Sequence, residues 1–274
     1  MPRPLRRFLR NPGGLLGLAL LAAILLVALL GPALVGDPLA QNLEARLQPP
    51  GPAHPLGTDQ LGRDILARAV HGARISLGVG FGVVVLAVLL GVGMGLLAGG
   101  LGGAWDNLLM RLTDVFFAFP SLILAMAIAA ALGPNLTNTV LAVALVTWPI
   151  YARLVRAQTL ALREREFVEA ARALGAGRGR ILLRHLLPNS LTPVLIQASY
   201  EVGAAILTAS GLSFIGFGAQ PPTPEWGAMV AETRNYMAEA PWAATVPAVG
   251  ILLTVLAFNL IGDGLRDALD PRGR

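Results

Sequence analysis

The sequence predicts an all-α integral membrane protein with six transmembrane helices. Hydrophobic residues make up 55% of its 274 positions and charged residues only 14%, a balance that soluble globular domains rarely show. Several apolar runs come close to the length of about 20 residues that crosses a hydrocarbon core of about 30 Å. The basic residues, all of them arginine, flank these runs. Because there is no cysteine, disulfides and thiolate metal sites are excluded.

The first apolar run covers residues 13–35 and follows four arginines. It exceeds the apolar core of a secretory signal, about 7 to 15 residues, so we expect an uncleaved anchor helix. A proline-rich polar stretch follows over residues 37–74 and is not one regular helix. We expect an extracytoplasmic loop there that ends in a short amphipathic helix over residues 59–70. The anchor and the loop form a predicted N-terminal unit, residues 1–74.

The second span is expected over residues 75–99, where glycines recur at four-residue spacing. Small residues so placed let two transmembrane helices approach closely. We predict that this glycine face packs against another helix, of this chain or of a partner; its members are Gly78, Gly82, Gly91, Gly95 and Gly99. The run also fits the nucleotide-binding pattern G-x-G-x-x-A, but that motif must follow a strand and open a soluble helix, so we discard it.

The other four spans are expected over residues 115–132, 139–151, 194–217 and 243–261. Pro120 lies near the start of the third span, and a GPNLTN turn separates the third from the fourth. The fourth is short for a crossing, although its helical pattern continues to residue 162. Residues 218–241 are expected to form an external loop. The predicted transmembrane domain covers residues 75–274.

The distribution of arginine predicts the orientation, because cytoplasmic flanks are enriched in basic residues. With six spans and the N-terminus inside, the inner segments hold 16 arginines and the outer segments 5. Both termini are therefore expected in the cytoplasm. The polar segment between spans four and five, residues 163–189, is expected on the same side.

Within that segment the apolar residues recur at i, i+3, i+4 and i+7, which places them on one face of a short helix. They are Phe167, Ala170, Ala171 and Leu174. Gly175 and Gly177 are expected to end this helix. A second short helix is expected to reach Leu187 and to be closed by Pro188. Two short helices at an angle, with small alanines on the first, would project from the bundle and could enter a partner's cleft.

This segment resembles the EAA motif of permease subunits in bacterial ATP-binding cassette (ABC) importers. The residues that carry the resemblance are Glu169, Ala170, Ala171, Gly175, Leu187 and Pro188. The resemblance implies a type I ABC importer permease fold, in which this loop is the coupling helix. That helix docks on an ATPase subunit and transmits its closure to the membrane helices. The family consensus often has Ile where this chain has His185.

Three further stretches are similar to the dipeptide, oligopeptide and nickel permeases of that family, and more narrowly to the second of the two permease subunits. They are HPLGTDQLGRDIL (residues 54–66), GLSFIGFGAQPPTPEWG (residues 211–227) and FNLIGDGLRDALDPR (residues 258–272). The resemblance implies peptides as the first expected substrate and nickel as the second. Many relatives carry Glu where this chain has Ala209, so no role of that carboxylate is carried over.

The resemblance also implies the partners and the location. The partners would be a second homologous permease subunit, two ABC ATPase subunits and an extracytoplasmic solute-binding protein, in a bacterial plasma (inner) membrane. This chain has no G-x-x-x-x-G-K-[ST] phosphate loop and no hydrolase motif, so we expect no enzyme activity and no cofactor. ATP would be bound by the ATPase subunits. Nucleic-acid binding is disfavoured because no soluble basic domain exists, and the three histidines lack metal-ligand spacing.

Glu201 is the only charged residue deep inside a predicted span. A charge at the centre of a lipid-exposed helix costs about 2.5 to 3.5 kcal/mol, so Glu201 should face the bundle interior or a water-filled path. A role in the translocation path and a structural hydrogen bond both stay open. An ion-coupled secondary transporter would carry several such residues and internal repeats, and the sequence shows one residue and no clear repeat.

Overall fold

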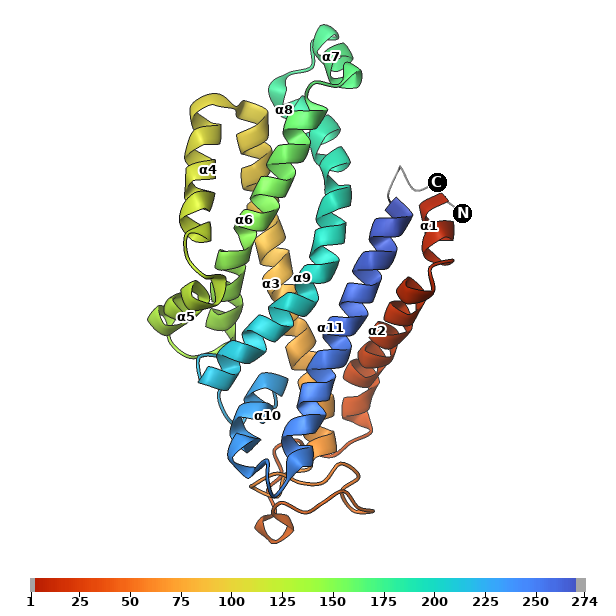
Figure 1. Ribbon diagram of the computed structural model, residues 1–274, viewed down its shortest axis with the longest axis vertical. Coiled ribbons are helices and arrows are strands. Elements are labelled where there is room, and N and C mark those ends of the chain that lie inside the picture. Colours follow the sequence, from red (N-terminus) through yellow and green to blue (C-terminus); the bar gives the residue numbers. More distant parts are fainter. Residues whose placement is uncertain (1–2, 270–274) are drawn as a thin grey trace.

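The computed structural model describes residues 3–269, and this part of the chain is almost entirely helical (Figure 1). Five long helices pack side by side along the long axis of the molecule: α2 (Pro12–Leu30), α3 (Ile65–Leu101), α6 (Leu136–Leu162), α9 (Leu187–Ile215) and α11 (Pro241–Leu269). The shorter helices are α1 (Arg3–Phe8), α4 (Gly103–Phe117), α5 (Ser121–Leu132), α7 (Glu166–Ala173), α8 (Arg178–Arg180) and α10 (Trp226–Thr233). No strand occurs among the described residues.

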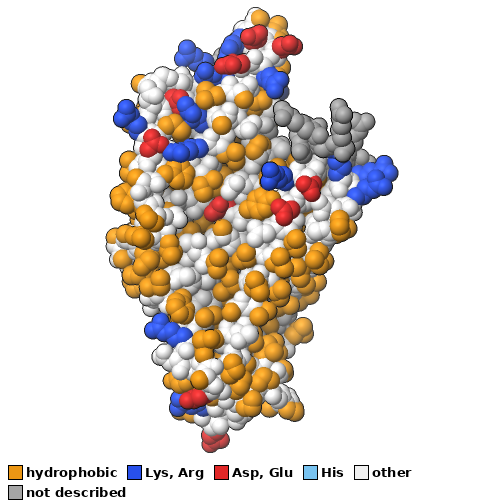
Figure 2. Space-filling model, in the orientation of Figure 1, with side chains coloured by type: hydrophobic (Ala, Val, Ile, Leu, Met, Phe, Trp, Pro, Cys, Tyr) orange, Lys and Arg blue, Asp and Glu red, His pale blue; other side chains and the backbone are white. Residues whose placement is uncertain are grey.

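The five long helices are apolar enough to cross a membrane, and the bent pair α4 and α5 makes a sixth span if counted as one. Helices suit this solvent because they satisfy their backbone hydrogen bonds internally. Large apolar side chains point outward along the bundle, as at Leu16, Leu89, Leu195 and Leu252. Figure 2 shows hydrophobic side chains over the middle of the molecule, with charged side chains gathered toward its ends. The prediction of an all-α membrane protein is confirmed.

Helix α3 differs from the prediction at its start. The short helix expected over residues 59–70 begins only at Ile65, and it runs without interruption through the expected span over residues 75–99 as one helix of 37 residues. The Asp64 side chain caps it, accepting a hydrogen bond of 2.8 Å from the backbone N–H of Ala67. The polar residues near its beginning do not break it, because Arg68 is buried in an ion-pair cluster. The predicted unit boundary at residue 74 therefore falls inside a helix.

The third span is bent rather than straight. Helices α4 and α5 meet at an angle of 92°, with residues 118–120 between them. Pro120 precedes α5 with extended backbone (ψ 124°), and proline disfavours helical backbone at the residue before it. Two ion pairs hold α4 against α6: Arg156 binds Asp106 through two hydrogen bonds of 2.5 and 2.7 Å, and Arg153 binds Asp114.

The predicted glycine face of α3 is two faces. Gly91, Gly95 and Gly99 press against α6; a Cβ on Gly95 would lie 2.4 Å from the carbonyl oxygen of Ala152. Gly78 has nothing within 4 Å of such an atom, and Gly82 only a side-chain methyl at 3.4 Å. At about 100° per residue, Gly78 and Gly82 lie roughly 140° and 180° around the helix from Gly91. Close packing is therefore confirmed for the last three glycines; Gly78 has no close neighbour within this chain, and its packing against a partner stays a prediction.

The structure also defines the end of α6 and the content of the expected external loop. Helix α6 continues to Leu162, as its pattern indicated, and carries Pro149 in its interior. The expected external loop over residues 218–241 contains a helix that the sequence analysis did not predict, α10. Helix α10 packs between α9 and α11 at the end of the molecule opposite α7 (Figure 1).

Candidate functional site

Helix α7 projects beyond the ends of α6 and α9 at one end of the molecule (Figure 1). One side chain, Val168, anchors it: Val168 is fully buried in an apolar cluster with Ile181 and Leu186. The other apolar residues face outward, since Phe167 is 41% exposed and Leu174 is 89% exposed. An apolar surface that no described residue covers is unusual for a short connecting segment and is suited to a partner protein.

Gly175 ends α7 by the mechanism that its sequence position suggested. Its φ is +79°, a conformation that favours glycine. Its N–H donates to the carbonyl of Arg172 at 2.9 Å, and the next N–H, of Ala176, donates to the carbonyl of Ala171 at 3.0 Å. This pair of bonds is the Schellman arrangement that closes helices. Gly177 plays a different part, because it has φ −68° and precedes α8.

The predicted closure at Pro188 is wrong. After α8 the chain continues through a π-helical segment, η3 (Ile181–Leu186), directly into α9, and Pro188 lies in the first turn of α9. The wider π turn has its own bond, from the N–H of Leu187 to the carbonyl of Leu182. Pro188 has no N–H to donate to the preceding turn, and the π turn that comes directly before it already departs from the α-helical bonding pattern. The projecting segment is therefore joined to a membrane-spanning helix without a break.

The six predicted coupling residues fall in two places. Glu169 and Ala170 are exposed on α7, Ala171 is half-buried there, and Gly175 is its exposed cap. Leu187 is half-buried and Pro188 exposed at the start of α9. Glu169 and Glu166 lie in the first turn of α7, where acidic side chains favour the helix N-terminus.

A polar group lies inside the bundle around Glu201. The Glu201 side chain, on α9, is half-buried and accepts one long hydrogen bond, 3.4 Å, from the amide of Gln197. Tyr151 lies on α6, a helix that packs against α9. Tyr151 is fully buried, and its hydroxyl has no hydrogen-bond partner among the described residues. Sequence reasoning missed Tyr151, because a tyrosine in an apolar span gives no separate signal.

A buried carboxylate in the stretch over residues 211–227 connects several helices at the opposite end of the molecule. Glu225 is buried and caps α10, accepting bonds from the N–H groups of Gly227 and Ala228 at 3.0 and 2.9 Å. It also accepts from the hydroxyl of Ser76, on α3, at 3.1 Å and from that of Ser210, on α9, at 3.4 Å. One carboxylate therefore connects α3, α9 and α10.

A second cluster ties the same region to the loop before α3. The buried guanidinium of Arg63 donates to Asp59 at 2.6 Å and also binds Glu232 of α10. Arg68 donates to Glu232 at 3.2 Å. Arg63 and Arg68, counted as external charges in the sequence, are thus structural, since buried arginines require such partners.

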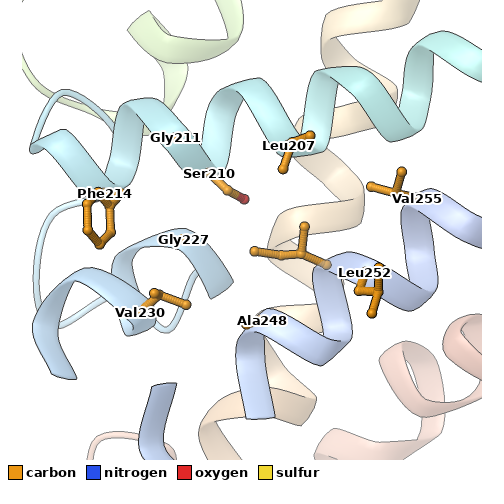
Figure 3. A pocket seen from close by; sticks show the side chains of 10 residues that line it. Leu207, Ser210, Gly211, Phe214, Gly227, Val230, Ala248, Leu252 and Val255 are labelled. Atoms are coloured by element: carbon orange, nitrogen blue, oxygen red, sulfur yellow. The ribbon is translucent and has the colours of Figure 1, made fainter. Parts of the chain in front are cut away.

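A cavity of about 370 Å³ lies between α9, α10 and α11 (Figure 3). Leu207, Phe214, Val230, Leu252 and Val255 surround it, and Ser210 supplies one hydroxyl. Its lining has no ionisable side chain, so it is unsuited to the charged ends of a peptide. Among the residues described, no group of three His, Asp or Glu side chains could hold a metal ion.

Comparison with known proteins gives the family. Residues 91–274 match the family model of the binding-protein-dependent transport system inner membrane component. Residues 4–50 match the N-terminal TM domain of oligopeptide transport permease C.

Relatives cover most of the chain, and the similar proteins are named as permease components of transport systems. The chain is 51% identical to the dipeptide transport system permease protein DppC of Alkalihalophilus pseudofirmus, over 84% of this chain and 76% of that one. It is 46% identical to the di/tripeptide transport system permease protein DppC of Pseudomonas aeruginosa, over 99% and 93%. It is 50% identical to the glutathione transport system permease protein GsiD of Pectobacterium atrosepticum, over 81% and 74%.

The fold also matches a solved structure. A chain of the MetNI methionine ABC transporter in an inward-facing conformation superposes with a TM-score of 0.59, covering 74% of this chain and 96% of that one. The sequences are 19% identical, so this likeness concerns the fold alone.

Proposed function

The chain belongs to the family of binding-protein-dependent transport system inner membrane components, and on this premise we propose that it is one of two permease subunits of an ATP-driven peptide importer. The observation that carries the proposal is the projecting helix α7, with its outward apolar residues and its packing on η3, the segment that continues into α9. Membership of the family implies ATPase partners and a partner permease. The names of the relatives, which refer to dipeptides, di/tripeptides and glutathione, favour peptides as the substrate class.

The proposed coupling runs through α7 into the membrane. An ATPase subunit binds the outward side of α7, where Ala170 offers no bulk and Glu169 stands at the edge. Displacement of α7 moves Val168, which is packed on Ile181 and Leu186. Because η3 continues into α9, the displacement passes to a helix that contacts α3, α6 and α11. Leu187 and Pro188 act at the junction, as the first turn of α9.

The proposed assembly contains this chain, a second homologous permease, two ABC ATPases and an extracytoplasmic solute-binding protein. It lies in a bacterial plasma membrane with α7 and both termini in the cytoplasm. Helix α1 and the end of α11 lie at the same end of the molecule as α7, which supports this orientation (Figure 1). Residues 1–74 serve as the anchor and external part, and residues 75–274 as the transmembrane domain with its coupling loop.

Glu201 belongs to the proposed translocation path. Among the described residues its carboxylate, inside a membrane-spanning helix, accepts only one long hydrogen bond, and the buried hydroxyl of Tyr151 on the adjoining α6 has no partner. Polar groups left with unused hydrogen-bonding capacity in a membrane protein are costly and mark paths for polar substrates. Together they offer an acceptor and a donor for a peptide passing between this chain and the second permease.

Substitution of Ala170 tests the coupling role. Ala170→Asp places a charge in the proposed contact, and burying an unpaired charge typically costs several kcal/mol. We expect the complex purified in nanodiscs to lose its ATPase subunits or to hydrolyse ATP without importing peptide, while both permeases stay paired. Glu169→Ala should have the same effect in milder form, because water can partly replace a carboxylate.

Gly179→Asp is the matched control for Ala170→Asp. It adds the same charge to the neighbouring α8, at a position where a Cβ meets nothing within 4 Å. Normal co-purification of the ATPase together with normal peptide-stimulated hydrolysis in Ala170→Asp would contradict the coupling assignment. Import of a radiolabelled dipeptide, delivered by the partner binding protein, tests the substrate class separately.

A further inference from the structure

A second cavity, of about 460 Å³, lies between α7 and the ends of the membrane-spanning helices. The end of α3, the residue that follows α6, the α7–α8 connection and η3 all line it. Three arginines, Arg163, Arg172 and Arg178, form its polar wall, and Leu101, Ile181 and Leu182 belong to its apolar wall. We call it the arginine pocket. Neither the family assignment nor the proposed ATPase-binding surface of α7 gives this pocket a role.

The arginine pocket has an unbalanced positive charge. Arg163 donates to the carbonyl of Gly99 at 3.4 Å, and its nearest carboxylate, that of Glu164, is 3.9 Å away and exposed. The guanidinium groups of Arg172 and Arg178 have no hydrogen bond or ion pair with any described residue. Three guanidinium groups around one cavity repel one another unless an anion lies between them. Arginine is also the side chain best suited to phosphate, which it can bind through two parallel hydrogen bonds.

The apolar wall distinguishes the kind of anion. Ile181 is buried, Leu182 lies over Gly100, and Leu101 is 42% exposed at the last position of α3. The wall therefore continues the apolar surface of a membrane-spanning helix. A free phosphate ion gains nothing from such a wall, whereas a phospholipid places its phosphate among the arginines and the start of its acyl chains along the leucines. Basic residues beside a membrane attract anionic lipids by about a fivefold gain in affinity each.

We propose that the arginine pocket binds the phosphate of an anionic phospholipid from the cytoplasmic leaflet. The occupant is a lipid rather than a carboxylate of the ATPase, because the outward residues of α7, Phe167, Ala170 and Leu174, are absent from the lining. The phosphate of a bound lipid lies between Arg172 on α7 and Arg178 on α8, offsets part of their charge, and fixes α7 relative to the end of α3. The inference rests on the proposed orientation and is independent of the peptide substrate.

Lipid retention by the complete purified transporter tests the proposal. The complex in detergent is titrated with phosphatidylglycerol and, separately, with phosphatidylcholine, and bound lipid is counted by native mass spectrometry. Arg172→Gln/Arg178→Gln should bind phosphatidylglycerol about 25-fold more weakly than the unchanged complex, at about fivefold for each arginine. Phosphatidylcholine binding should stay weak in both.

The control, Arg180→Gln/Arg184→Gln, removes the same charge from exposed positions that do not line the pocket. It should retain phosphatidylglycerol. Equal loss in both double variants would overturn the proposal, since the effect would then be general surface charge. Loss of ATPase subunits with unchanged lipid binding in Arg172→Gln/Arg178→Gln would assign the arginines to the ATPase instead. Full displacement of the lipid by inorganic phosphate, at constant ionic strength, would show a free-anion site and would also overturn it.

Discussion

At the scale of single residues, the polar groups inside this chain separate into satisfied and unsatisfied sets. Glu225 has four donors around its carboxylate and connects three helices. Glu201 has one long bond, and the Tyr151 hydroxyl has none among the described residues. A satisfied buried carboxylate stabilises a structure, whereas an unsatisfied one in a membrane suggests transport. The two glutamates therefore call for different experiments.

Glu201→Gln removes the charge while keeping the size and most of the hydrogen-bonding capacity. A hydrogen bond to a charged group contributes about 1.5–3 kcal/mol, so we expect peptide import to fall by about tenfold or more with the ATPase still bound. The comparison is Gln197→Ala, which removes the bond to Glu201 and should affect thermal stability rather than import. If Glu201→Gln imports peptide at the normal rate, the carboxylate has only a structural role.

Glu225→Ala leaves two backbone N–H groups and the hydroxyls of Ser76 and Ser210 without their acceptor. Loss of a helix cap and of buried hydrogen-bond partners costs about 1–3 kcal/mol, so the apparent unfolding midpoint in detergent should fall clearly. Glu225→Gln should lose less because it keeps an acceptor oxygen. Glu239→Ala, at an exposed position, should have an unfolding midpoint close to that of the protein without substitutions. Equal midpoints for Glu225→Ala and Glu239→Ala would refute this account.

At the scale of helices, α3 organises the bundle. Near its start, Arg68 joins the ion-pair cluster with Glu232. Its middle contacts α9, and Gly91, Gly95 and Gly99 allow α6 to approach closely. At the other end, α8 and the π-helical segment η3 run into α9 without a break, and α7 packs on η3. Both features link one face of the membrane to the other through continuous helix. A change at α7 therefore has a mechanical route into the bundle.

Gly95→Leu should disrupt the α3–α6 contact, because even a Cβ there would lie 2.4 Å from a backbone carbonyl. Overpacking of this kind costs about 1–3 kcal/mol or more, and the thermal midpoint of the purified chain should fall accordingly. Gly78→Leu is the matched control on the same helix, since nothing lies within 4 Å of a Cβ there. A drop of similar size in both variants would mean that leucine disturbs α3 itself and not its packing.

At the scale of the whole molecule, the chain has two chemically different ends with an apolar middle (Figure 2). The end with α7 carries exposed arginines, including Arg172 and Arg178. The opposite end buries Arg63 and Arg68 against acidic partners, so its effective positive charge is smaller than the sequence count implies. The positive-inside rule counts basic residues rather than net charge, so the asymmetry of 16 against 5 arginines that predicts α7 in the cytoplasm is not altered by these ion pairs.

Single cysteines test this orientation without background, because the chain has none of its own. Gly177→Cys, on the exposed connection after α7, should react in intact cells only with a membrane-permeant maleimide. Ala53→Cys, on the exposed loop before α3, should react with an impermeant one from outside. The reverse labelling pattern would invert the proposed topology.

The sequence by itself determined the spans, the arginine asymmetry, the projecting helix with its cap at Gly175, and the resemblance to ABC permeases. These are local properties: hydrophobic length, periodicity and the conformational preference of glycine act within a few residues. They also predicted the close approach at Gly95, because small residues at four-residue spacing form a flat helix face.

Only the tertiary structure decided which features act together. The hydrogen bond between Ser76 and Glu225 joins residues 149 positions apart, and the ion pair of Arg63 with Glu232 joins residues 169 apart. No local sequence pattern predicts these contacts, which hold α3, the loop before it and α10 together. Local sequence also did not predict that Gly78 and Gly91 lie on different faces of α3, or that the helix continues past Pro188. Periodicity identifies a face of a helix, but its neighbour is chosen by the return path of the chain and by the buried polar groups that must find partners.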